Sequence, residues 1–215
     1  MLSVVCRKWH GQPPTKAEVA RHHRTYTGHS RKLSPDLLPQ PARWYRDRMY
    51  GIELLLGAEI NILDTQGTLD LDEFHMNLLD LRIAGIHSLC YTPGTPEENT
   101  QGMIKAIENP YTHIISHPGD GTAKLLFEPI VQAAKAHHTL LEINNSSLKP
   151  CRNKVEARPN NLEILRLCKQ YEVPVILGSD AHISFDIATY DHALELVKET
   201  EFPESLILNT DVARF

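Results

Sequence analysis

The stretch of sequence that most restricts the fold is residues 173–182, VPVILGSDAH. Its continuous apolar run begins at a proline and stops at a glycine, which is typical of a strand covered on both faces in a parallel α/β sheet. Asp180 and His182 follow this glycine closely. In α/β barrels, polar residues at the carboxyl ends of strands carry the chemistry. The stretch therefore predicts a buried parallel strand that ends at a functional edge.

Composition restricts the class of protein. The chain has 215 residues, of which 41% are hydrophobic, and its mean hydropathy of -0.31 is ordinary for one soluble globular domain. No apolar run is long enough for a membrane span, and the start lacks the pattern of a signal peptide. The net charge of -5 gives no reason to expect non-specific nucleic-acid binding. Four cysteines without a CxxC pair indicate reduced thiols and a cytoplasmic protein.

Two parts of the chain differ in pattern. Residues 1–48 carry five prolines, many basic residues and only short apolar runs, so an irregular or poorly ordered segment is expected there. Residues 49–215 alternate strand-like and helix-like patterns and form the predicted folded domain. Strands are expected at residues 51–63, 81–87, 113–119, 139–145, 173–180 and 205–210, and helices at 69–80, 100–108, 125–137, 160–172 and 191–200. Thr100 and either Asn160 or Asn161 are the expected helix caps.

This alternation predicts a parallel sheet with right-handed crossovers. The polar residues at successive strand ends lie between 25 and 38 residues apart, close to the roughly 31 residues of one barrel unit. About six such units are expected. A doubly wound open sheet is the rival architecture, but the sequence has no Gly-rich phosphate turn after its first strand.

Five of these strand-end residues would converge on one face of a barrel. Imidazole and carboxylate together are ligands for zinc, manganese or iron, and a carboxylate can bridge two cations in a binuclear hydrolytic site. A lone histidine after a strand is more often a turn residue, whereas agreement among five strand ends favours a metal site. The predicted metal ligands are Glu59, His87, His117, Asp180 and His182. The histidines at 75, 113, 137, 138 and 192 are expected to be structural or solvated.

The segments GAEIN, AGIH, IISHPG, LEINNSS and GSDAH, in this order, resemble the PHP (polymerase and histidinol phosphatase) superfamily. The similarity is greatest to its small stand-alone bacterial phosphatases and covers residues 50 to about 209. It implies a distorted seven-stranded (β/α) barrel that hydrolyses phosphomonoesters by metal-bound hydroxide. It also implies two to three zinc or manganese ions as cofactors and a small phosphorylated substrate as the partner.

The resemblance also assigns roles to the strand-end residues. Glu59 would bridge the first two metals, and the histidines at 87 and 117 would bind the second. Asp180 would bind the first metal, and His182 would bind the third and assist protonation of the leaving group. The loop after the fifth strand could bind phosphate or be a solvated turn, and the sequence leaves both readings open. The candidate phosphate-binding residues are Asn144, Asn145, Ser146 and Arg152, with added charge from Lys154.

The N-terminal part departs from the family pattern. The family begins with a strand carrying an HxH motif and a second strand ending in T-[DE]-H, and neither motif occurs in this sequence. A divergent or frame-shifted N-terminus upstream of about Arg43, an incomplete barrel and a single retained metal are therefore expected, with impaired activity. Two alternatives stay open: an inactive metal-binding remnant of the fold, and a PHP module acting on nucleic-acid ends. The lack of a basic stripe weighs against the second alternative.

Overall fold

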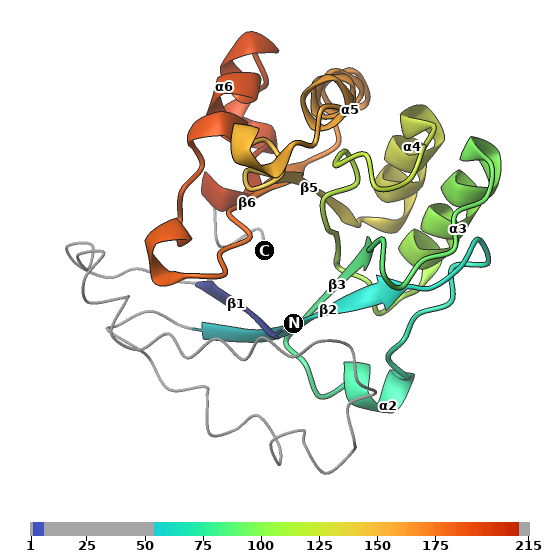
Figure 1. Ribbon diagram of the computed structural model, residues 1–215. Coiled ribbons are helices and arrows are strands. Elements are labelled where there is room, and N and C mark those ends of the chain that lie inside the picture. Colours follow the sequence, from blue (N-terminus) through green and yellow to red (C-terminus); the bar gives the residue numbers. More distant parts are fainter. Residues whose placement is uncertain (1, 7–53, 211–215) are drawn as a thin grey trace.

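The computed structural model describes residues 2–6 and 54–210, which form an α/β fold around one sheet (Figure 1). The strand order follows the chain, from β1 to β6. Strand β1 runs antiparallel to β2, and the strands from β2 to β6 run parallel to one another. The strands are β1 (Leu2–Cys6), β2 (Leu54–Ile62), β3 (Leu81–Ile86), β4 (Ile114–Ile115), β5 (Leu140–Asn144) and β6 (Val175–Gly178). The predicted parallel α/β sheet is confirmed. Strand β1 lies in the segment 1–48 that was expected to be irregular, and residues 7–48 of that segment lie outside the described residues.

The larger helices lie along one side of the curved sheet, in chain order (Figure 1). Side chains from these helices, such as Met103 and Ile164, form one buried core with strand residues such as Leu141. The other side of the sheet carries a smaller cluster of Leu81, Ile114, Leu140, Ile176 and Leu208. The parallel strands are thus covered on both faces, as their apolar runs predicted. The helices are α2 (Glu73–Met76), α3 (Pro96–Glu108), α4 (Phe127–His137), α5 (Ala157–Tyr171) and α6 (Asp191–Glu199).

Helix α3 begins earlier than the sequence prediction placed it. Thr95 is its N-cap, and Pro96 is its first residue. The Thr95 hydroxyl accepts from the backbone N–H of Glu98, and the Glu98 carboxylate accepts from the backbone N–H of Thr95. The sequence TPEE is a capping box with proline in the first turn, which explains the start. Thr100, the expected cap, lies inside the helix, and its hydroxyl donates to the Pro96 carbonyl.

Two further predictions at the C-terminal side were wrong in detail. Helix α5 starts at Ala157, so both expected caps, Asn160 and Asn161, lie inside its first turns. Asn161 is buried there, and its side chain donates to the Ala157 carbonyl. The expected strand at 205–210 is a pair of 3-10 turns with one parallel bridge to β6. The side chain of Asn209 accounts for this, because it accepts from Leu177 N and donates to Leu177 O. A side-chain amide therefore occupies the place of a further strand.

No helix within the described ranges is long and apolar enough to cross a membrane. The carboxyl ends of β2 to β6 lie at the same edge of the sheet, because these strands are parallel and in consecutive order. Loops that leave this edge carry most of the residues predicted to bind metal.

A candidate metal centre at the carboxyl edge of the sheet

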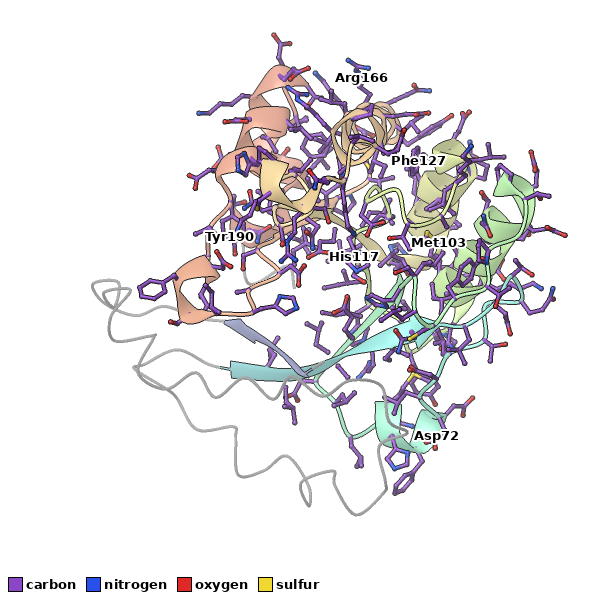
Figure 2. All side chains as sticks on the ribbon, viewed as in Figure 1. Asp72, Met103, His117, Phe127, Arg166 and Tyr190 are labelled. Carbon is purple, nitrogen blue, oxygen red and sulfur yellow. The ribbon has the colours of Figure 1, made fainter. Side chains whose placement is uncertain are left out.

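Three predicted ligands from three neighbouring strands meet at this edge. Glu59 lies in β2, His87 directly follows β3, and His117 lies just after β4. Glu59 Oε1 is 3.1 Å from His87 Nε2 and 3.1 Å from His117 Nε2, and the two Nε2 atoms are 3.1 Å apart. Figure 2 shows His117 on the inner side of the sheet, with Met103 and Phe127 on the helix side. The structure therefore brings these three predicted ligands together, and their role as metal ligands stays a prediction.

The spacing of the three atoms fits a metal ion. Zinc with nitrogen and oxygen ligands at roughly 2.0–2.2 Å in a tetrahedron requires ligand atoms about 3.3–3.6 Å apart, slightly more than the 3.1 Å found here. The three side chains are mostly shielded, with exposed fractions of 13% for Glu59, 32% for His87 and 11% for His117. The Nδ1 atom of His87 is buried without a hydrogen-bond partner. Two imidazoles and a carboxylate converging through Nε2 and Oε1 form the one group among residues 54–210 that could hold a metal ion.

Charge interactions inside the group are strong. Burial raises the pKa of the Glu59 carboxyl, but hydrogen bonds and charge from His117 and His87 outweigh it and hold that pKa well below its usual range. Burial lowers the pKa of His117, yet Glu59, Asp120 and Glu142 together raise it to about 9. The surrounding carboxylates thus favour the protonated form of the His117 imidazole. A bound cation would replace the proton on Nε2 as the partner of Glu59.

The backbone at His117 is held by a neighbouring strand. Strand β4 has two residues, and His117 leaves it with a left-handed φ of 33°. Its N–H donates to Glu142 Oε2 of β5 at 2.8 Å. Burial, with Glu59 nearby, raises the pKa of Glu142 to about 7. A side chain at Gly178 of β6 would leave no room for this carboxylate, because a Cβ there would lie 1.6 Å from Glu142 Oε1.

The other two predicted ligands stand apart from the three-residue group. Asp180 has a left-handed φ of 47°. Burial and then the charge of Glu59 raise the pKa of its carboxyl, against the opposing effect of nearby cationic side chains. The exposed His182 turns back, with Nδ1 3.0 Å from the Asp180 carbonyl oxygen and 3.5 Å from Oδ1. The charge of Glu59 therefore affects the pKa of Asp180, but the Asp180 oxygens are not among the converging ligand atoms.

The loop predicted to bind phosphate is tied to the protein by its own side chains. Asn144 Oδ1 accepts from Ser147 N at 2.8 Å, and Asn145 Oδ1 accepts from Ala193 N of α6 at 3.0 Å. Arg152 Nη2 donates to Ser146 Oγ at 3.0 Å. These contacts give both asparagines a role in holding the loop. The role of the four residues toward phosphate stays a prediction.

Histidines outside the site have local partners. His113 contacts the Arg82 guanidinium, and burial and this charge lower the pKa of His113. His75 contacts Asp72, the N-cap of α2. His138 has a left-handed φ at the C-cap of α4. These three agree with the structural roles expected for them.

Two carboxylates next to His117 were not predicted as site residues. Glu142 lies in the LEINNSS run, where its place at a strand end was the available signal. Asp120 lies three residues after His117 in HPGDG, and its Oδ2 is 3.4 Å from His117 Nδ1. An acid three residues after a candidate ligand in a tight Pro-Gly turn could have pointed to Asp120.

Comparison with known proteins relates the chain to named bacterial proteins. It is 43% identical over 164 residues to a probable phosphatase of Clostridium novyi, a match covering 76% of this chain and 66% of that protein. It is 40% identical over 169 residues to one of Thermoanaerobacter sp., covering 78% and 68% of the two chains. A third, from Caldicellulosiruptor saccharolyticus, is 42% identical over 165 residues, covering 77% and 68%. The chain thus spans about two thirds of the length of these relatives. No protein-family model matches it.

Proposed function

The chain belongs to the family of these probable phosphatases, and we propose that it is a metal-dependent phosphatase of the PHP superfamily that acts on small phosphomonoesters. The observation that carries the proposal is the convergence of Glu59, His87 and His117, whose ligand atoms lie 3.1 Å from one another. The parallel sheet with its larger helices along one side is compatible with part of a distorted seven-stranded barrel.

The three residues would hold one zinc or manganese ion, with Oε1 of Glu59 and Nε2 of each histidine as donors. When bound, such an ion would supply Lewis-acid chemistry, which would lower the pKa of a water and polarise phosphate oxygens. Glu59 supplies the negative charge that attracts the cation, and its partly buried position strengthens this attraction. The neighbouring Glu142 adds negative charge at the same edge.

Residues around this group supply the remaining functions. Arg152 is exposed at the end of the loop after β5, where its guanidinium can bind two phosphate oxygens side by side. Asp180, which lies within the electrostatic influence of Glu59, would provide a carboxylate for any further ion beside this group. His182, with Nδ1 directed at the Asp180 carbonyl, keeps Nε2 available to exchange a proton with a leaving group.

A second candidate is a metal-binding protein without turnover. Its support is that one three-ligand group is present among residues 54–210, whereas phosphoryl transfer at binuclear sites uses two ions. The sequence also lacks an HxH motif. The expected stoichiometry is therefore about one tightly held metal per chain.

Elemental analysis and an aryl phosphate assay with added zinc or manganese separate these functions. One metal per chain with slow turnover, both lost in Glu59→Gln, is the expected result. Metal without turnover would favour the second candidate. Three tightly held metals would show that other residues complete further sites, and the histidines at 22, 23 and 29 would be the first to replace. A chain that binds no metal would overturn the proposal.

A further inference from the structure

The turn that carries His117 contains a second, almost fully buried carboxylate. The side chain of Asp120 is 5% exposed, and its Oδ2 lies 3.4 Å from His117 Nδ1. The opposite ring nitrogen, Nε2, faces Glu59 and His87. One imidazole is therefore placed between a buried acid on one side and the candidate metal group on the other.

Asp120 is itself held by several donors. Its Oδ1 accepts from the backbone N–H of Thr122 at 2.8 Å, and its Oδ2 accepts from the Thr122 hydroxyl at 2.8 Å. Lys154, from the segment between β5 and α5, donates to the same Oδ2. Donors at both oxygens favour the ionised carboxylate and fix its plane. A carboxylate held in this way can fix the orientation of the His117 ring by accepting from its Nδ1–H.

We propose that Asp120 is a positioning residue, which holds the Nδ1–H of His117 and thereby directs its Nε2 atom toward Glu59 and His87. A histidine that ligates a metal through one nitrogen usually donates its other N–H to a carboxylate or carbonyl, which sets the tautomer and the ring orientation. The inference rests on the proposed function, because the group that Nε2 faces is the proposed metal centre. The placement of the ring can nevertheless be measured without metal.

A purely structural role for Asp120 would give different results. The Asp120 N–H donates to the His117 carbonyl at 3.0 Å, and the contacts with Thr122 close the turn. If Asp120 only closed the turn, then removing its contact with Thr122 and removing its contact with His117 would have the same effect on the turn. Thr122→Val removes one hydroxyl donor to Asp120 and leaves the contact with His117, so it is the matched control for Asp120→Asn.

The first measurement uses the metal-free full chain with ¹⁵N-labelled histidine. A proton on His117 Nδ1 that is held by a shielded carboxylate should give a downfield, slowly exchanging NMR signal, identified by its loss in His117→Asn. We expect Asp120→Asn to lose this signal while its circular dichroism stays native. Thr122→Val should keep the signal. A native-like Asp120→Asn that keeps the signal would overturn the inference.

The second measurement is zinc affinity by competition with a chelator. Replacing the outer partner of a ligating histidine typically costs 10–100-fold in metal affinity, and we expect a loss of about that size in Asp120→Asn. Thr122→Val should stay within about threefold of the unmodified chain. If the unmodified chain binds no zinc but Asp120→Asn still loses the signal, the positioning role stands and the proposed function fails. Equal zinc affinity in both variants would overturn the inference.

Discussion

Two histidines at opposite ends of one short strand differ in almost every physical respect. His113 directly precedes β4, and His117 follows it after Ser116. His113 contacts the guanidinium of Arg82, and burial and this charge lower its pKa. His117 faces Glu59, Asp120 and Glu142, which raise its pKa to about 9.

The difference shows what separates a structural histidine from a candidate ligand in this sheet. At the amino end, the cationic Arg82 is satisfied by neutral acceptors, the carbonyls of Tyr111 and Leu79 and the ring of His113. At the carboxyl end, several carboxylates gather around His117 and place negative charge next to one another. Negative charge concentrated at the carboxyl end of the parallel strands favours the binding of a cation there.

The largest expected effect comes from exchanging each histidine for asparagine. His117→Asn should lower zinc affinity by more than about 100-fold, since losing a direct ligand exceeds the usual cost of losing its outer partner. His113→Asn should leave zinc affinity within about twofold, because its ring lies at the other end of β4. Chelator competition measures both. Equal losses in the two variants would remove the distinction between the two ends.

A smaller effect is expected at Gly178. In Gly178→Ala the new Cβ would overlap the Glu142 carboxylate, which must then leave the N–H of His117. We expect a loss of roughly 1–3 kcal/mol in the free energy of unfolding, measured in urea.

The double variant Glu142→Ala with Gly178→Ala provides the control. Removing the carboxylate removes the clash, so the two changes should be non-additive by about 0.5–3 kcal/mol. Strict additivity would show that Gly178 does not make room for Glu142.

At the amino end, Arg82→Met should affect stability alone. The carbonyls of Tyr111 and Leu79 lose their side-chain donor, at a cost of about 1 kcal/mol for each hydrogen bond. Zinc affinity should not change. Arg82→Lys, which keeps the charge without the planar fork, should recover part of the stability. A change in zinc affinity in Arg82→Met would contradict the separation of the two ends.

The smallest effect is the dependence of stability on pH through His113. Its pKa in the folded protein lies below 6.5, so the unfolded chain takes up a proton first as the pH falls. His113 therefore contributes full stability above pH 6.5 and loses it as the pH falls through its folded pKa. The free energy of unfolding of the unmodified chain relative to His113→Asn should decline from pH 8 to pH 5. A flat difference would show that His113 titrates as it does in the unfolded chain.

The sequence predicted the structure best where a single pattern within a short segment determines the element. The apolar runs that stop before a polar residue predicted the strands β2 to β6. The carboxyl ends of β2, β3 and β4 carry Glu59, His87 and His117. This worked because parallel strands in consecutive order place their carboxyl ends at one edge. The start of α3 was missed although its signal, the capping box at Thr95, was present in the sequence.

Other features depend on contacts between distant segments. Lys154 reaches Asp120 from the segment before α5, and the carboxylate of Glu142 in β5 receives the N–H of His117 from the end of β4. No local periodicity encodes such pairs, because they depend on how the strands and loops lie against one another. Asn209 illustrates the same limit, since its side chain replaces a strand that the residues 205–210 would otherwise favour.

His117 and Asp180 both have a left-handed backbone, which lowers folding stability at two positions whose side chains are candidate site residues. Glycine adopts such φ values without steric cost, whereas histidine and aspartate adopt them less readily. A search for more stable variants would therefore select glycine at both positions, and each gain would remove an imidazole or a carboxylate from the carboxyl edge of the sheet. Under the proposed function, glycine at either position would relieve the backbone and remove a metal ligand in the same step, so activity there would be kept at the expense of stability.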